Sequence, residues 1–336
     1  MTGFQRRRDG KLAEAFAKDP REELFLKRLN DLLAPQADAD LLDLDERFPM
    51  LHVVGVPRSG TTLLHQVIAT GLDVGYVNNL VAAFWRAPVY GIRLSRKLGL
   101  DELDSSFESG FGRTRGIAEP HEFGYFWNGH LRYPDLCERP EGHEETIDWA
   151  GLRRVLVNMA HASERPFVLK PMLLMWHLER MLAEMPRTCF VWIRRDAKQT
   201  ALSLLSMRRA LFGTLDRWAS LRPGGPDWLE GEPPWRQVAA QVLVLERVIE
   251  DAAARIGDES LVTIRYEELC ADPREALGRV RELLAGKGVE PALRSGELGP
   301  FEQRRSSLEV EFGDRVEAAL DELADAPLLA RSAESG

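Results

Sequence analysis

Apolar residues along the chain fall into short continuous runs that alternate with longer segments of helical periodicity. Short apolar runs bounded by polar or glycine-bearing turns are typical of strands buried on both faces of a sheet. The runs are LHVVGV at 51–56, RPFVLKP at 165–171, TCFVWIRR at 188–195 and LVTIRYEEL at 261–269. Because helical segments separate these runs, the pattern predicts an α/β fold, with a mostly parallel sheet flanked by helices.

The remaining segments predict one domain with two helix-rich parts. The helical pattern at 10–34 is interrupted near Pro20 and is expected to end in the stretch APQADAD. We therefore expect a helical N-terminal segment over 1–45 and a helical lid or acceptor subregion over 79–165. The whole chain, 1–336, is predicted to form a single domain.

Within the lid subregion, two stretches bear on the site. The polar, glycine-bearing residues 101–118 predict a loop over the site. The stretch EPHEFGYFWNGH, at 119–130, predicts a helix with Pro120 in its first turn.

Charge and composition narrow the possible functions. The net charge of -9 argues against broad nucleic-acid binding, which requires a basic surface. A local basic pocket for one small anion is still compatible with that charge. The three cysteines have no paired spacing, so neither a disulfide framework nor a zinc ribbon is predicted. No signal peptide or membrane-spanning stretch is apparent, so we expect a cytoplasmic protein without a membrane partner.

The first strand leads into a glycine loop with the spacing of a phosphate loop. Gly55 and Gly60 have four residues between them, and Thr61 and Thr62 follow at the start of a predicted helix. Backbone N–H groups and the helix dipole favour an anion there, and the threonine hydroxyls add donors. The pattern G-x-x-x-x-G-K-[ST] requires a lysine where this chain has Thr61, and the only cation of the loop is Arg58.

A loop without that lysine fits a group that carries less charge than a triphosphate. An ATP- or GTP-dependent enzyme needs the lysine and a magnesium ion held in part by an acidic side chain. The strands that could supply this acid end instead in Lys170 and in Arg194 and Arg195. A 5′-phosphosulfate fits the donors that remain, and no metal is predicted.

Two motifs resemble those of sulfotransferases that use 3′-phosphoadenosine 5′-phosphosulfate (PAPS). PRSGTT, at 57–62, resembles the loop that holds the 5′-phosphosulfate. RDAKQTALS, from Arg195 to Ser203, resembles the 3′-phosphate motif, in which an arginine and a serine lie eight residues apart. IRYEELCADP, at 264–273, resembles a late block of bacterial members related to tyrosylprotein sulfotransferases. The resemblance covers about residues 50–285.

The resemblance implies that PAPS is the co-substrate and that no metal takes part. The 3′-phosphate is assigned to Arg195 and Ser203, because a guanidinium fork and a hydroxyl can share one phosphate. The 5′-phosphosulfate is assigned to the loop residues Arg58, Ser59, Gly60, Thr61 and Thr62.

The same resemblance, together with positions at the carboxyl edge of the predicted sheet, suggests roles for three further side chains. Arg58 carries a permanent charge that can stabilise the leaving 5′-phosphate. Lys170 is placed beside the bridging oxygen, where it can supply charge or a proton. Tyr266 follows a strand at the same edge and is assigned to the nucleotide. Whether Arg304 or Arg305 also contacts the nucleotide is left open.

The catalytic base is left open among three residues. The tyrosylprotein enzymes carry a glutamate about one helix after the loop, where this chain has Asn78 and Asn79. Asparagine cannot accept a proton at neutral pH. His121 is the first replacement, because a helix N-terminus would keep its imidazole neutral and able to accept a proton. Glu119 and Glu122 flank it, and either could orient His121 or be the base.

These residues predict sulfuryl transfer from PAPS to a hydroxyl or amine of a small-molecule acceptor. One alternative is a P-loop kinase or phosphotransferase, against which the missing lysine and the 3′-phosphate motif argue. Another is a non-catalytic nucleotide-binding homologue, which the asparagines in place of the glutamate permit. The sequence determines neither the acceptor nor the oligomeric state.

Overall fold

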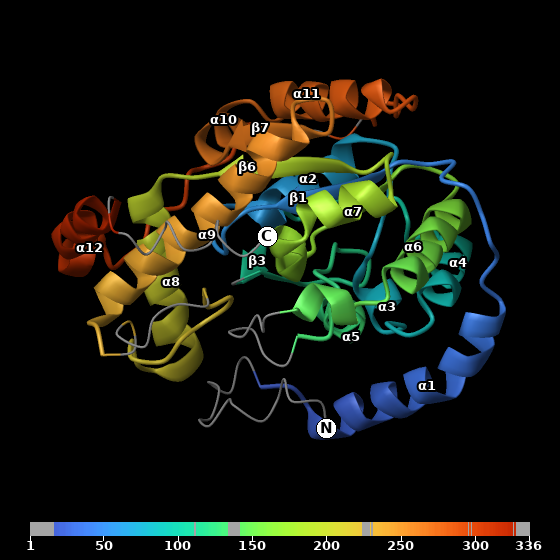
Figure 1. Cartoon of the computed structure of the whole chain (residues 1–336), viewed down its shortest axis with the longest axis horizontal. Helices are drawn as coiled ribbons and strands as arrows, with labels where there is room; N and C mark the ends of the chain where they lie inside the picture. The colour runs from blue at the N-terminus through green and yellow to red at the C-terminus, as the bar shows by residue number, and fades with distance from the viewer. Residues whose placement is uncertain are drawn as a thin grey trace.

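A five-stranded parallel sheet forms the centre of the part of the chain that the structure describes. The computed structural model describes residues 17–110, 112–133, 142–223, 229, 231–294, 296, 298–324 and 326. The strands, in spatial order, are β2 (Gly75–Tyr76), β5 (Phe167–Leu169), β1 (Met50–Val54), β6 (Cys189–Arg194) and β7 (Leu261–Arg265). All neighbouring pairs in this sheet are parallel. The predicted α/β fold is confirmed (Figure 1).

Helices cover both faces of the sheet because alternate strand residues point to opposite sides. The helices that follow β1, β5, β6 and β7 are α2 (Thr61–Gly71), α7 (Leu178–Glu184), α8 (Ala197–Phe212), α9 (Pro234–Ile256), α10 (Tyr266–Ala271) and α11 (Pro273–Gly286). Val191 and Ile193 of β6 belong to one buried cluster, to which α2 and α11 contribute. Phe190 and Trp192 belong to the other, to which α6 (Trp149–Ser163), α8 and α9 contribute.

The N-terminal segment differs from its prediction. Pro20 begins a single helix, α1 (Pro20–Ala39), which continues through Pro35 where the sequence predicted a break. Proline removes one helical hydrogen bond. Ala34 and Ala37, on either side of Pro35, are buried against the rest of the protein, and this packing stabilises the helix. The part of the predicted helix before residue 17 lies outside the described residues.

The subregion at 79–165 combines helices with extended segments, and its role as a lid stays a prediction. Its helices are α3 (Asn79–Ala82), α4 (Pro88–Lys97), α5 (Gly124–Leu131), a 3₁₀ turn (His143–Thr146) and α6 (Trp149–Ser163). The predicted loop at 101–118 contains a small hairpin of β3 (Ser109–Gly110) and β4 (Arg113–Thr114).

The predicted helix start at Pro120 is wrong. Pro120 instead forms an antiparallel bridge with Asn78, the N–H of His121 donates to the Val77 carbonyl at 2.8 Å, and α5 begins only at Gly124. Pairing with the chain after β2 therefore keeps residues 120 and 121 extended.

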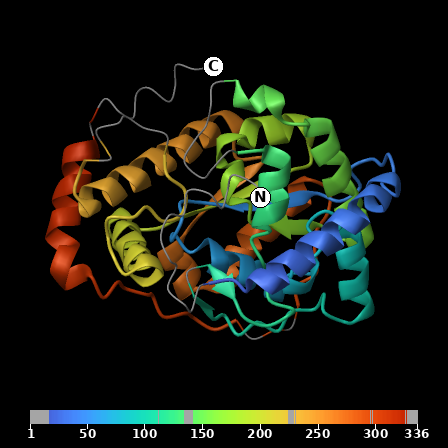
Figure 2. The same cartoon turned by 90° about the horizontal axis from the view of Figure 1, so that it is seen from below.

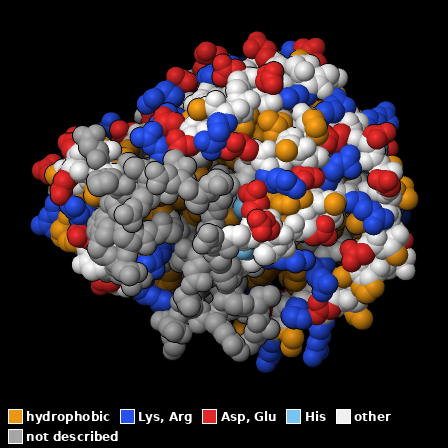
Figure 3. Space-filling model, in the orientation of Figure 1, with side chains coloured by type: hydrophobic (Ala, Val, Ile, Leu, Met, Phe, Trp, Pro, Cys, Tyr) orange, Lys and Arg blue, Asp and Glu red, His pale blue; other side chains and the backbone are white. Residues whose placement is uncertain are grey.

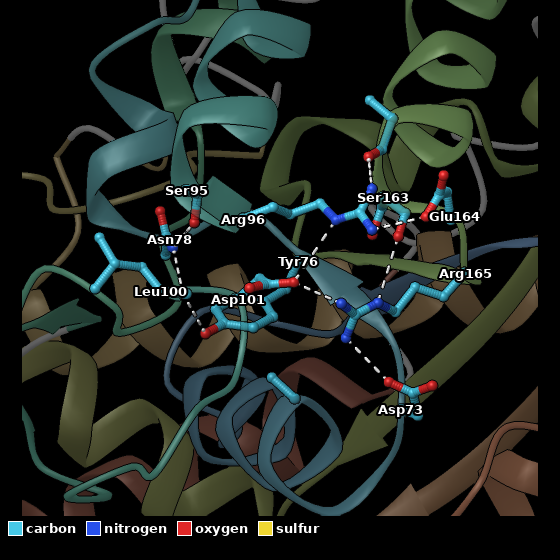
Figure 4. Close-up of polar contacts among 12 residues, drawn as sticks. Asp73, Tyr76, Asn78, Ser95, Arg96, Leu100, Asp101, Ser163, Glu164 and Arg165 are labelled. Atoms are coloured by element: carbon cyan, nitrogen blue, oxygen red, sulfur yellow. Dashed lines mark hydrogen bonds and ion pairs between the residues drawn. The ribbon is translucent and has the colours of Figure 1, made fainter. Parts of the chain in front are cut away.

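An ion-pair cluster fastens the lid subregion to the edge of the sheet opposite the site (Figure 4). Arg165, just before β5, donates to Asp73 at 3.0 Å and to Asp101 at 2.5 Å. Arg96, in the last turn of α4, donates to Glu164 at 2.7 Å. These contacts join the ends of α4 and α6 to the starts of β2 and β5, at the edge of the sheet away from the carboxyl ends of the strands.

Helix α12 (Glu309–Ala324), the last that the structure describes, and α1 lie toward opposite ends of the molecule (Figure 2). On the face shown in Figure 3, Lys and Arg side chains are interspersed with Asp and Glu. Among the described residues, no helix has both the length and the apolar character needed to cross a membrane. The cytoplasmic location and the single-domain organisation stay predictions.

Candidate functional site

A cavity of about 590 Å³ opens at the carboxyl edge of the sheet. Ligands of open parallel sheets bind at this edge, where the loops after neighbouring strands meet. The loop after β1, the end of β6 and the start of α10 all contribute to its walls. Of the residues assigned to the nucleotide, those that line it are Arg58, Gly60, Thr61, Thr62, Arg195, Ser203 and Tyr266.

The glycine loop adopts a conformation that its glycines make possible. Gly60 has a φ of +105° and caps α2, and a Cβ there would lie 2.5 Å from Cδ2 of Tyr266. No side chain caps this helix end, so the first N–H groups of α2 face the loop as anion donors. Arg58, at φ 77°, takes a left-handed conformation that costs energy in a non-glycine residue. Ser59 is fully buried and does not line the cavity.

The two phosphate motifs contact each other across the cavity. Nε of Arg58 donates to Oγ of Ser203 at 3.1 Å, and Nη1 of Arg195 donates to the Arg58 carbonyl at 3.1 Å. The Arg195 guanidinium lies 4.4 Å from the centroid of the Tyr266 ring. Burial, together with the charge of Arg195, lowers the pKa of Arg58 to about 10. A bound anion would relieve this repulsion between guanidinium groups.

The loop that contains Arg304 and Arg305 closes the same end of the cavity. Both arginines line it. The N–H of Arg304 donates to the Tyr266 hydroxyl at 3.2 Å, and its carbonyl accepts a hydrogen bond from Arg195. Its guanidinium donates to the Ser109 carbonyl, in β3, at 3.1 Å. The structure therefore brings both residues to the end of the cavity formed by Arg195 and Tyr266. Whether either residue contacts a nucleotide stays open.

Lys170 and Glu122 form an ion pair beside Thr62. Nζ of Lys170 donates to Oγ1 of Thr62 at 2.8 Å and to Oε1 of Glu122. Lys170 is 2% exposed, whereas Glu122 lines the cavity. Burial lowers the pKa of Lys170, and the negative charge of Glu122 opposes that effect. Gly112 lies over the pair, where a Cβ would be 2.8 Å from Oε1 of Glu122.

His121 faces a different cavity. It lines a second cavity of about 280 Å³, bounded also by Leu26 and Trp85, which we call the α1 cavity. Nδ1 of His121 accepts the Phe123 N–H at 2.8 Å, so the proton of the neutral ring is on Nε2. Burial lowers its pKa to about 4. The ring is neutral as expected, but desolvation is the cause and not a helix terminus.

Glu119 and Asn78 have structural roles. The carboxylate of Glu119 is 5% exposed and accepts hydrogen bonds from Gln66 at 2.9 Å and from the Ser106 N–H at 2.9 Å. Asn78 caps α3 and donates to Oγ of Ser95 at 2.7 Å (Figure 4). Asn78, one of the two asparagines at the position of the glutamate in the tyrosylprotein enzymes, therefore stabilises the packing of α3 against α4.

Two methionines at the site were missed by the sequence analysis. Met172 and Met207 line the large cavity. Met207 lies four residues after Ser203 on α8, so helical spacing could have placed it on the same face. Met172 follows Lys170 by two residues, in a 3₁₀ turn that the sequence did not indicate. Among the described residues, no group of three or more His, Cys, Asp or Glu side chains is arranged to hold a metal.

Comparison with known proteins gives the family. The model of the sulfotransferase family matches residues 49–286, so the chain belongs to this family. Omega-hydroxy-beta-dihydromenaquinone-9 sulfotransferase Stf3 of Mycobacterium bovis and of Mycobacterium tuberculosis is 23% identical over 262 residues. The match spans 70% of this chain but only 62% of the length of these relatives.

Solved sulfotransferase structures also resemble the chain. STF1 from Mycobacterium tuberculosis is 17% identical, with a TM-score of 0.49 over 80% of this chain and 76% of that one. STF9 from Mycobacterium avium is 18% identical, with a TM-score of 0.45 over 92% and 78%.

Proposed function

We propose that this sulfotransferase moves the sulfuryl group of PAPS to a hydroxyl of a small-molecule acceptor by in-line transfer. The observation that carries the proposal is the convergence of two separate motifs on one cavity. The loop after β1 and the Arg195–Ser203 pair lie together, joined by the Arg58–Ser203 hydrogen bond. The loop suits a 5′-phosphosulfate and the pair suits a 3′-phosphate, and PAPS carries both groups.

We assign the base to Glu122. Its carboxylate lines the large cavity beside Thr62 and Lys170, where the sulfuryl group would lie. Nε2 of neutral His121 carries a hydrogen and cannot accept another proton, and the ring faces the α1 cavity. The carboxylate oxygens of Glu119 already accept hydrogen bonds from Gln66 and Ser106, and Glu119 does not line the large cavity. Of these three residues, only Glu122 has an atom that can accept a proton and that is reached from the large cavity.

Lys170 and Arg58 supply the positive field. Negative charge builds on the transferred group and on the leaving oxygen, and a fixed positive charge stabilises it. Lys170 also donates to Thr62, which orients this hydroxyl at the start of α2. Arg58 has a permanent charge at the crest of the loop and serves the leaving 5′-phosphate.

For the acceptor, we propose an alcohol with an apolar body. Met172 and Met207 provide polarizable, adaptable walls in the large cavity. Stf3 is named as a sulfotransferase of omega-hydroxy-beta-dihydromenaquinone-9, a molecule with a hydroxyl group.

Turnover of [³⁵S]PAPS with a panel of alkyl alcohols, phenols, sugars and amines tests this proposal. Absence of transfer to every acceptor, with nucleotide binding intact, would favour the non-catalytic alternative.

Calorimetry separates the proposal from the kinase alternative. We expect adenosine 3′,5′-bisphosphate, the desulfated product of PAPS, to bind more tightly than ATP with magnesium. The physical reason is that Arg195 and Ser203 suit a 3′-phosphate, whereas Thr61 replaces the lysine that a triphosphate needs. Tighter binding of ATP would support a phosphotransferase instead.

Replacement Arg195→Ala should weaken binding of adenosine 3′,5′-bisphosphate by about 1.5–3 kcal/mol, the range for a hydrogen bond to a charged group. Adenosine 5′-phosphate, which lacks the 3′-phosphate, should bind the variant and the parent protein almost equally. Titration calorimetry with both nucleotides gives the comparison. Equal losses for the two would remove Arg195 from the 3′-phosphate site.

Activity should survive an excess of chelator. Arg58, Lys170 and the N–H groups of α2 supply the positive field that a magnesium ion provides in kinases. The rate of sulfuryl transfer is measured before and after treatment with EDTA, with a magnesium-dependent kinase as the control. Loss of activity that magnesium restores would contradict the assignment.

A further inference from the structure

The α1 cavity is separate from the cavity that holds the proposed reaction. Leu26, Ala82 and Trp85 give it apolar walls, and its polar or charged lining residues are Lys18, Glu23, Asn79, His121 and Tyr125. None of these residues lines the large cavity. The extended segment at 120 and 121 divides the two spaces, because His121 faces one and Glu122 the other, as successive residues of an extended chain do.

Helix α1 covers this cavity and is fastened at two points. Asn30, which is fully buried, donates to the Ala83 carbonyl at 2.7 Å and accepts the Arg86 N–H at 2.8 Å. At the start of the helix, Lys18 donates to the Tyr125 hydroxyl at 2.6 Å. Figures 1 and 2 both show α1 along the side of the lid subregion. The cavity lies between the two attachments, which hold α1 in place above it.

Two polar side chains offer one donor and one acceptor. The Phe123 N–H occupies Nδ1 of His121, so Nε2–H is the donor that remains. Nδ2 of Asn79 donates to the Gly116 carbonyl at 2.7 Å, which fixes the amide and leaves Oδ1 as an acceptor. Neither Nε2 of His121 nor Oδ1 of Asn79 is among the fully enclosed, unpartnered polar atoms of the described residues, and both residues line the cavity. We therefore take these two atoms as the hydrogen-bonding groups that the cavity offers to a ligand.

The surroundings favour a neutral, aromatic ligand. Burial keeps the His121 ring neutral, with its pKa lowered to about 4. Lys18 and Glu23 also line the cavity, but they pair with each other at 3.0 Å, so their charges offset each other. Moving a charged group between apolar walls would cost far more than one hydrogen bond returns. The Trp85 and Tyr125 rings, with centroids 4.8 Å apart and tilted by 45°, both border the space. Such rings pack well against another flat ring.

We propose that the α1 cavity is a second binding site, for a small neutral aromatic molecule that carries a carboxamide or hydroxyl group. The group pairs with Nε2–H of His121 and Oδ1 of Asn79, and the ring lies against Trp85 and Tyr125. The site is independent of the sulfuryl transfer proposed above, and its ligand binds together with the donor nucleotide.

The test uses benzamide, which has both a donor and an acceptor, and measures its affinity by calorimetry and by NMR of the His121 ring nitrogens. Benzamide should bind more tightly than toluene or benzoate and should shift the Nε2 signal. His121→Phe keeps a flat ring without the donor and should weaken binding about three- to tenfold. Ala82→Trp fills the cavity and should abolish binding. Leu32→Trp, at a side chain 79% exposed, is the matched control and should change nothing.

Adenosine 3′,5′-bisphosphate serves as the folding control, since every variant should bind it as the parent protein does. Failure of benzamide to bind the parent protein, or equal benzamide affinity in Ala82→Trp, would overturn the proposal. Displacement of benzamide by the nucleotide would also overturn it, because the ligand would then occupy the large cavity.

Discussion

Replacement Glu122→Gln should lower turnover by about 10²–10⁴-fold, the usual contribution of a general base. Glutamine keeps the size of the side chain and its hydrogen bond with Lys170, but it cannot take the proton of the acceptor hydroxyl. Affinity for adenosine 3′,5′-bisphosphate should barely change, because Glu122 lies outside both phosphate motifs. Steady-state kinetics with a sulfatable alcohol, together with nucleotide calorimetry, measures the two effects.

Matched variants separate Glu122 from its neighbours. His121→Ala should stay close to the parent turnover, since the ring faces the α1 cavity. An acceptor with a more acidic hydroxyl should lose less in Glu122→Gln, because it needs less help to lose its proton. A collapse of turnover in His121→Ala with normal activity in Glu122→Gln would return the role to the histidine. If both variants stay active, neither residue removes the proton.

Replacement Lys170→Met should lower turnover by about 10²–10³-fold, the usual cost of removing one group that stabilises developing charge. Methionine fits the buried space of the lysine, and Glu122 keeps access to solvent, so the fold should tolerate the change. Lys27→Met, which removes a lysine from an exposed pair with Asp31, is the control and should leave the rate unchanged. Parent-like turnover in Lys170→Met would show that this charge is not needed.

The pH profile gives a second measure of the Lys170–Glu122 pair. Burial lowers the pKa of Lys170 and the charge of Glu122 raises it. The alkaline limb of the rate should therefore begin below the pH at which a free lysine titrates, where Lys170 loses its proton. In Glu122→Gln the opposing charge is absent, so the residual activity should decline at a still lower pH. An alkaline limb that does not move in this variant would mean that Lys170 does not set it.

Local pattern alone was sufficient for four of the five strands of the sheet and for two motifs that meet at the large cavity. The long strands, such as β6, are apolar on both faces because helices cover both, and that produces continuous apolar runs. The glycine loop and the Arg195–Ser203 spacing lie within single strand–loop–helix units, so their geometry follows from short-range sequence. Strand β2, with two residues, was too short to give a pattern.

The placement of His121 and Glu122 was decided by tertiary contacts. The cavity that each residue lines depends on which side of the chain it faces, and pairing of Pro120 with Asn78 fixes that. The sequence predicted a helix there, on which the same residues would point elsewhere. The Glu122–Lys170 pair joins residues 48 positions apart, and Arg304 reaches Ser109 across 195 positions. The sequence thus carried the motifs of the family, and packing between distant segments determined which side chains meet at each cavity, because no local pattern encodes such contacts.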